Sequence, residues 1–217
     1  RPSGRQDPDM PAGRAPIATR PGTDADVPSV VAVMADAFAD DPVLRFVLDD
    51  GPDPDPDRRR SLLAAFFANR LLGGRGIDEI VVPADPADAR EAAAVWIPPH
   101  APELDLSMLR AVNDLAIGAE AMQARTMALM PLLTAHPATP HWYLNLVGTR
   151  ASARGRGLAS AVISAVTDRC DADGVGAYLE SSDPANVPLY QRHGFVVTAQ
   201  VAIDGGPTVP LMWRDPR

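Results

Sequence analysis

A segment rich in glycine and arginine, residues 148–159, has a composition that suits phosphate binding. Gly155 and Gly157 flank Arg156, and an apolar run ending at Val147 precedes them. Apolar residues then recur at helical spacing, which predicts a strand, a basic loop and a helix start in that order. A helix start presents free backbone N–H groups to an anion, and glycine lets the backbone approach it closely. We therefore interpret this segment as a phosphate-binding loop.

The same residues exclude two familiar nucleotide-binding loops. A Walker loop requires a lysine, and this chain of 217 residues contains none. The dinucleotide fingerprint requires a third glycine, but Ala159 and Ser160 follow Gly157. On the glycines alone, an ordinary flexible turn remains an alternative, because glycine clusters mark turns.

Two sequence motifs taken together indicate which phosphate-containing ligand the loop binds. Arg154-x-x-Gly157-x-Ala159 resembles the Q/R-x-x-G-x-G/A signature of the GNAT superfamily of N-acetyltransferases. The run from Asn186 to Phe195 is similar to that family's second signature, N-x-x-x-Y-x-x-x-G-F. The two motifs stand in the family's order, with one expected helix and one expected strand between them. Together they identify the chain by resemblance as an N-acetyltransferase.

Further segments resemble the puromycin N-acetyltransferase branch of this superfamily, and the likeness extends from about residue 17 to residue 213. These segments are Ala37–Asp40, Ala94–Trp96, His141–Leu144 and Leu179–Ser182. Because they also occur in GNAT proteins of unknown substrate, they support the branch and not puromycin as the acceptor.

The hydrophobic pattern predicts alternating strands and helices, which is typical of an α/β or α+β domain. Strands are expected at 17–20, 77–82, 92–97, 141–147, 177–181, 196–201 and 209–213, and helices at 27–38, 58–72, 104–133, 157–172 and 187–193. The resemblance implies the GNAT fold, a mixed, splayed sheet of six or seven strands flanked by helices. The helix at 104–133 would be an insert between strands three and four. Residues 1–15 are expected to be a disordered tail, and 16–217 one domain.

The resemblance also implies acetyl-CoA as co-substrate, with direct attack of an amine on its thioester. Tyr190 would protonate the departing CoA thiolate; the alternative is a tyrosine packed between helix and sheet. The expected cofactor-binding residues are Leu146, Val147, Arg154, Gly155, Arg156, Gly157, Leu158, Ala159, Asn186 and Tyr190.

Glu180, at the end of a predicted strand, is the leading candidate for the base that deprotonates the acceptor. A surface carboxylate is the alternative, and a backbone carbonyl near residue 142 or a water chain would leave no trace in the sequence. The candidate residues of the acceptor pocket are Phe38, Asp40, Trp96, His141 and Trp142.

Composition limits the partners. The formal net charge is −8, which disfavours nucleic acid. A single cysteine allows no intramolecular disulfide, and no apolar run is long enough to span a bilayer, so a cytoplasmic protein without membrane or metal partners is expected. We expect a monomer or homodimer that acetylates a small-molecule amine. The alternatives are a protein N-acetyltransferase and a non-catalytic acetyl-CoA sensor.

Overall fold

The computed structural model describes residues 16–49, 55–102 and 118–217. The tail expected at 1–15 and the first half of the expected helical insert therefore lie outside the described residues. The described insert is α5 (Ala119–Leu133). Gly118, just before it, has a φ of 88° and is not helical, so the expectation of one continuous helix across 104–133 is wrong at this residue.

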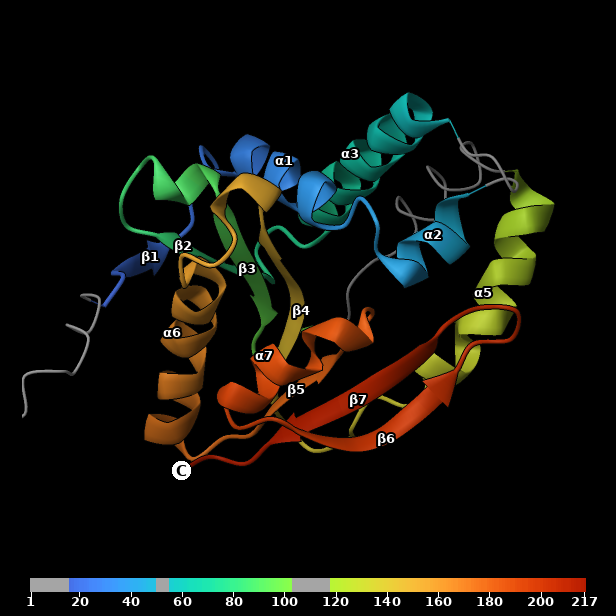
Figure 1. The fold of residues 1–217 in the computed structure, drawn as a ribbon. Helices are drawn as coiled ribbons and strands as arrows, with labels where there is room; N and C mark the ends of the chain where they lie inside the picture. The colour runs from blue at the N-terminus through green and yellow to red at the C-terminus, as the bar shows by residue number, and fades with distance from the viewer. Residues whose placement is uncertain (1–15, 50–54, 103–117) are drawn as a thin grey trace, which may run out of the picture.

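A seven-stranded mixed sheet forms the centre of the molecule (Figure 1), as the sequence predicts. Its spatial order is β1-β2-β3-β4-β5-β7-β6, and every neighbouring pair is antiparallel except β4 and β5. The strands are β1 (Thr19–Pro21), β2 (Glu79–Pro83), β3 (Ala92–Ile97), β4 (Trp142–Thr149), β5 (Ala177–Glu180), β6 (Val196–Ala202) and β7 (Thr208–Arg214).

Helices cover both faces of this sheet. The helix α6 (Leu158–Asp173) lies on one face, and α1 (Val27–Ala37) and α3 (Pro56–Gly73) lie on the other (Figure 1). The short helices are α2 (Pro42–Leu48), α7 (Val187–Arg192) and the 3-10 turns η1 (Asp88–Arg90), η2 (Ala151–Ala153) and η3 (Pro184–Asn186). Apolar residues on alternate strand positions pack against one layer or the other, so a hydrophobic core lies on each face of the sheet.

Asp26 stands at the N-terminus of α1, but its side chain does not cap the helix. The Asp26 carboxylate makes no cap hydrogen bond; it accepts from the Arg20 guanidinium at 2.8 and 2.9 Å and from the Thr23 N–H at 2.8 Å. This pairing lowers the pKa of Asp26. By contrast, Asp41 does cap α2, because its side chain accepts from the Leu44 N–H at 2.9 Å.

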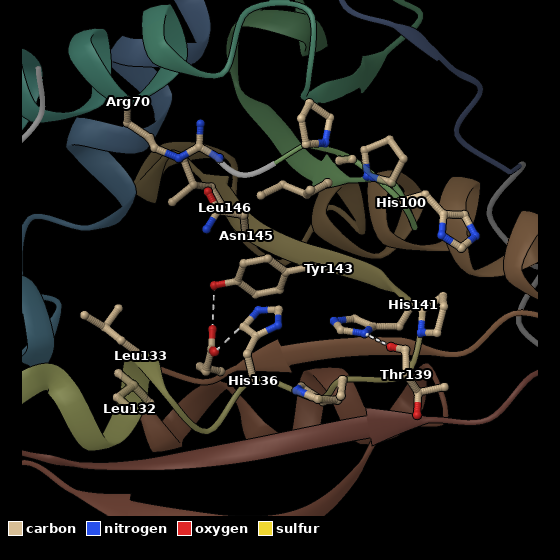
Figure 2. A pocket seen from close by; sticks show the side chains of 18 of the residues that line it. Arg70, His100, Leu132, Leu133, His136, Thr139, His141, Tyr143, Asn145 and Leu146 are labelled. Carbon is tan, nitrogen blue, oxygen red and sulfur yellow. Dashed lines mark hydrogen bonds and ion pairs between the residues drawn. The ribbon is translucent and has the colours of Figure 1, made fainter. Parts of the chain in front are cut away.

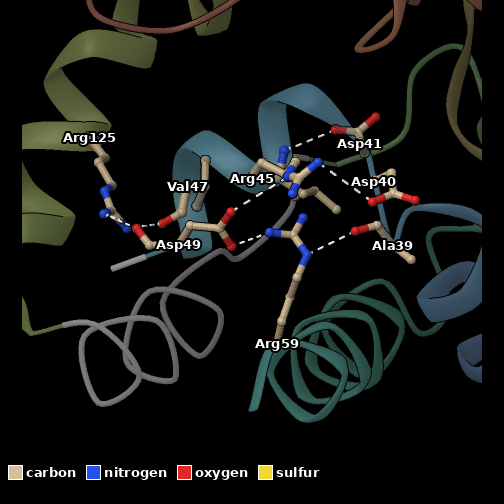
Figure 3. Close-up of polar contacts among 9 residues, drawn as sticks. Ala39, Asp40, Asp41, Arg45, Val47, Asp49, Arg59 and Arg125 are labelled. Atoms are coloured by element: carbon tan, nitrogen blue, oxygen red, sulfur yellow. Dashed lines mark hydrogen bonds and ion pairs between the residues drawn. The ribbon is translucent and has the colours of Figure 1, made fainter. Parts of the chain in front are cut away.

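Two arginines fasten α2 to its neighbours (Figure 3). Arg59 of α3 donates to the Ala39 carbonyl at 2.8 Å and pairs with the Asp49 carboxylate. Arg125 of α5 donates to the backbone carbonyls of Val47 and Asp49 at the end of α2. Cations at a helix C-terminus satisfy its free carbonyls and its dipole. These contacts fix α5 against α2.

The parallel pair β4 and β5 opens after a short ladder. Only Trp142↔Ala177 and Tyr143↔Tyr178 are in register, although β4 continues to Thr149. On the other side of β4, Leu144 and Leu146 pair with consecutive residues of β3, so Asn145 is the extra residue of a β-bulge. The splay that the resemblance implies is thus present, and cavities lie around it.

Candidate active site

One cavity, of about 470 Å³, lies where β4 leads into α6; we call it the α6 cavity. It brings together most of the residues expected to bind the cofactor. From that set it is lined by Val147, Arg154, Gly155, Gly157, Leu158, Ala159, Asn186 and Tyr190. The two sequence motifs, far apart along the chain, therefore meet at one cavity.

The α6 N-terminus opens onto this cavity without a capping side chain. Gly157 is its N-cap, with a φ of 84° and no side-chain hydrogen bond, and Gly155 has a φ of 75°. Both angles favour glycine. The first N–H groups of any helix lack intrahelical partners, and the helix dipole favours negative charge beside them. The arrangement is suited to a phosphate or pyrophosphate group.

The expected cofactor residues contribute in different ways. Arg154 lines the cavity, whereas the Arg156 guanidinium is paired with the Asp88 carboxylate at 2.5 Å. Leu158 is buried against Ala92 and Ala153, which leaves its backbone N–H as the group near the cavity. Leu146 lines two other cavities, described below.

Tyr190, on α7, joins the α6 cavity to a smaller one of about 170 Å³, which we call the central cavity. Its side chain is 7% exposed. Burial raises the pKa of Tyr190, and the nearby carboxylates of Asp41 and Asp183 add to the shift. The phenol is therefore neutral near pH 7 and can act as a proton donor. Asn186 ends the 3-10 turn that precedes α7.

A larger cavity of about 890 Å³ lies on the opposite side of the splay, between the end of β5, the start of β4 and α5; we call it the acceptor cavity (Figure 2). Glu180 is its carboxylate at the end of β5. The Tyr143 hydroxyl donates to Glu180 Oε2 at 2.5 Å, and Nε2 of His136 lies 4.0 Å from Oε1. Burial raises the pKa of Glu180, although the hydrogen bond from Tyr143 opposes the shift.

Four rings gather beside this carboxylate. The His136 ring lies edge-on to Tyr143, with centroids 4.5 Å apart, and its centroid is 5.1 Å from that of His141 (Figure 2). It also lies edge-on to Tyr178, at 4.8 Å. Burial and His141 lower the pKa of His136 to about 4. His136 is therefore neutral near pH 7 and does not neutralise the Glu180 carboxylate.

The central cavity adjoins both of the larger ones. It shares Val147 and Tyr190 with the α6 cavity, and Asn145, Leu146 and Glu180 with the acceptor cavity. A proton donor and a carboxylate thus border one small space from opposite sides.

Two residues expected in the acceptor pocket are elsewhere, and this is a correction. Trp96 and Trp142 are 0% and 4% exposed and pack in the core beneath α6. Successive residues of a strand point to opposite faces, so Tyr143, not Trp142, faces the acceptor cavity.

The other pocket candidates are divided. His141 lines the acceptor cavity, where its Nδ1 lies 2.6 Å from the Thr139 carbonyl. Phe38 lines the central cavity. Asp40 is exposed and pairs with Arg45 at 3.6 Å, beside a cavity of about 160 Å³.

Sequence reasoning missed His136 and gave no role to the side chains of Tyr143 and Asn145. Tyr143 and Asn145 could have been found by strand alternation, because they alternate with the buried apolar residues Trp142 and Leu144. His136 lies in a proline-flanked connection without periodicity, and no signal in the sequence marks it.

Within the described ranges, no helix is long and apolar enough to cross a membrane, and no group of three or more His, Cys, Asp or Glu side chains could hold a metal.

Comparison with known proteins finds similar sequences over the part of the chain that carries both motifs. A model of the acetyltransferase (GNAT) family matches residues 108–195, which include both motifs. Over 78 residues the chain is 36% identical to an uncharacterised N-acetyltransferase of Schizosaccharomyces pombe. That match covers 35% of this chain and 32% of the other protein, so the chain spans about a third of the length of this curated relative.

Solved structures resemble the whole domain. The histone acetyltransferase HPA2 and related acetyltransferase from Corynebacterium glutamicum is 28% identical, with a TM-score of 0.65 over 93% of this chain and 97% of that one. Arylalkylamine N-acetyltransferase 2 from Aedes aegypti is 10% identical, with a TM-score of 0.56 over 93% and 99%, and shares the fold. In sequence and fold the chain is thus similar to acetyltransferases of the GNAT family.

Proposed function

We propose that this protein transfers the acetyl group of acetyl-CoA directly to a primary amine of a small molecule. The observation that carries the proposal is the arrangement of cavities around the splay of β4 and β5. An anion-binding helix start lies on one side, a buried carboxylate on the other, and the central cavity adjoins both.

The residues of the α6 cavity fit the phosphate end of acetyl-CoA. Backbone N–H groups from Arg154 to Ala159 would hold the pyrophosphate, with the Arg154 side chain adding charge. Val147 and Leu146, on the opened part of β4, would line the path of the pantetheine arm. Asn186 would form a hydrogen bond to the pantetheine arm or order the helix α7. The acetyl thioester supplies the carbonyl carbon that the amine attacks.

Glu180 and Tyr190 have complementary roles in this proposal. An acceptor arrives as an ammonium ion, and Glu180 takes one proton from it, so that the nitrogen gains a free electron pair. After the nitrogen bonds to the acetyl carbon, it loses a second proton to water, and the bond from that carbon to sulfur breaks. The sulfur then takes the Tyr190 proton, and solvent returns this proton to the phenolate. Glu180 gives its own proton to water.

Two other functions compete with this one. A protein N-acetyltransferase needs an open groove for a chain end, whereas α5 and the connection that carries His136 flank the acceptor cavity. An acetyl-CoA sensor would need the α6 cavity but no base, and the Tyr143 and Glu180 pair supports turnover instead.

An amine panel tests the proposal. Release of the CoA thiol is followed with phenethylamine, tryptamine, agmatine, puromycin and a tetrapeptide with a free N-terminus; puromycin tests the branch resemblance. We expect at least one small amine to be acetylated faster than the tetrapeptide. Faster acetylation of the tetrapeptide would support the protein N-acetyltransferase instead. Tight acetyl-CoA binding without transfer to any amine would support the sensor.

A further inference from the structure

Apolar side chains from three separate elements line the acceptor cavity. Phe66 belongs to α3, Ile97 and Pro98 stand at the end of β3, and Leu132 and Leu133 end α5 (Figure 2). We call these five residues the apolar wall. The cavity volume of about 890 Å³ leaves room for the body of an acceptor as well as for its nitrogen. Moving apolar ligand surface from water onto such a wall is favourable, so the cavity suits an acceptor whose body is apolar.

Few carboxylates are available to a cation in this cavity. Within the described ranges, Glu180 is the only carboxylate among the residues that line it, and Arg70 is the only arginine. The Arg70 guanidinium donates to both carboxylate oxygens of Asp78, at 2.7 and 3.0 Å, and these two side chains are 5% and 4% exposed. Because Arg70 and Asp78 neutralise each other, Glu180 is the carboxylate that remains for the acceptor.

A second positive charge on the acceptor would have no such partner on the apolar wall. An ammonium group that leaves water for apolar surroundings loses hydration, and the loss is large unless an opposite charge or hydrogen bonds replace it. A methyl group at the same place loses nothing and buries apolar surface. The cavity should therefore distinguish amines of equal length by the group at the end that lies away from Glu180.

We propose that the acceptor is a monoamine with an apolar body, whose one positive charge is matched by Glu180 and whose body lies against the apolar wall. This inference rests on the proposed function and names the class of its substrate. Amines with one positive charge and an alkyl or aryl body are good acceptors. Diamines and polyamines are poor ones, because their second ammonium group is left without a carboxylate in the cavity.

Two amines of equal chain length test the inference. Pentylamine and 1,4-diaminobutane differ in whether a methyl or an ammonium group ends the chain. We expect kcat/KM of the native protein for pentylamine to be at least about tenfold higher, since the second ammonium group would be desolvated without a partner. In the amine panel, phenethylamine and tryptamine should likewise be acetylated faster than agmatine, whose guanidinium group adds a second charge.

Substitutions at Leu133 test whether the apolar wall causes this preference. Leu133→Glu adds a carboxylate to the wall at a side chain that is 53% exposed. The kcat/KM for 1,4-diaminobutane should then rise about tenfold relative to that for pentylamine. Leu133→Gln adds no charge and should lower kcat/KM for pentylamine without favouring the diamine. Met127→Glu is the control, because Met127 lies on the same helix, is 65% exposed and is not among the described residues that line the cavity.

The outcomes separate this inference from the proposed function. If the native protein acetylates 1,4-diaminobutane as well as pentylamine, or better, the inference is wrong and the proposed function stands. If Leu133→Glu and Met127→Glu change the ratio of the two kcat/KM values equally, the preference does not come from the apolar wall, and the inference is again wrong. If the native protein acetylates neither these two amines nor any amine of the panel, the proposed function fails, and the inference fails with it.

Discussion

The Tyr143 hydroxyl donates a hydrogen bond of 2.5 Å to Oε2 of Glu180, joining the first strand of the splayed pair to the last residue of the second. The bond orients the carboxylate at the edge of the acceptor cavity. Burial raises the pKa of Glu180 and at the same time raises that of Tyr143 well above its usual value. Tyr143 therefore stays protonated and acts as a donor across the working range of pH.

The pH dependence of acetyl transfer should follow Glu180. The protonated carboxyl cannot accept a proton, so kcat/KM should fall as the pH decreases through the raised pKa. We expect the midpoint of this limb to lie above the ordinary glutamate pKa, which is about 4.3. Glu180→Gln should lower kcat about 100-fold, a typical contribution of a general base, and should abolish the limb. An unchanged limb in this variant would assign the proton transfer to another group.

The stability of the same variant gives an independent check. Because the pKa of Glu180 is higher in the folded state, its stabilising contribution is present below the unfolded pKa and is lost as the pH rises through the folded pKa. Glu180→Gln should therefore have a higher Tm relative to the native protein at pH 8 than at pH 4. Thermal unfolding at the two pH values measures this difference. The opposite order would show that the carboxylate is stabilised by its partners.

Two glycines at opposite ends of α6 provide a matched test of the phosphate site. Gly157 and Gly174 both have left-handed angles, with φ of 84° and 66°. Replacing either by alanine should cost about 1 kcal/mol and lower Tm by about 3 °C. Only Gly157→Ala should also weaken acetyl-CoA binding, because Gly157 lines the α6 cavity, where we place the pyrophosphate. Calorimetry should show a dissociation constant for acetyl-CoA that is about tenfold higher in this variant. Equal affinities in the two variants would place the pyrophosphate elsewhere.

Tyr190→Phe tests the proton donor. The variant keeps the ring in its buried position and removes the hydroxyl, so Tm and acetyl-CoA affinity should change little. The kcat for a good amine should fall by about 100-fold. If kcat is retained, solvent protonates the thiolate and Tyr190 has a packing role, the alternative recognised from the sequence.

Arg125 is expected to position the wall of the acceptor cavity. Arg125→Met removes the hydrogen bonds to the end of α2 and should cost about 1 kcal/mol. Because α5 ends beside His136, the KM for the amine should rise while that for acetyl-CoA stays constant. Arg60→Met is the control, since this side chain is 75% exposed in its pair with Asp57, and such pairs contribute little. Equal effects of the two substitutions would contradict the positioning role.

Several elements could be predicted because one local signal dominates each of them. The strand β3 begins and ends at the predicted residues, since an apolar run lies between a polar turn and Pro98. The helix α6 is predicted by Gly157 at its start and by the apolar residues at helical spacing that come after it, and it ends with Gly174 as its C-cap. For residues 43–48 the apolar run alone fits either a strand or a helix, and the Asp41 cap settles it as the helix α2.

The acceptor side could be predicted less well, for a physical reason. Helices cover both faces of the sheet, so Ala92 to Trp96 are all fully buried and show no polar alternation. The sequence therefore makes Trp96 a pocket candidate by its residue type alone. The cofactor side depends on backbone geometry set by local glycines, which a sequence motif records directly. The acceptor side depends on contacts between distant segments, such as that between His136 and Glu180.

The most direct test of acetyl transfer is to quantify both products of one reaction. The native protein is incubated with acetyl-CoA and the fastest amine of the panel, and the free CoA thiol and the acetylated amine are measured together by mass spectrometry. We predict equal amounts of the two, formed at a rate that requires Glu180 and Tyr190. Thiol release without an acetylated amine, or acetyl-CoA binding without either product, would contradict the account.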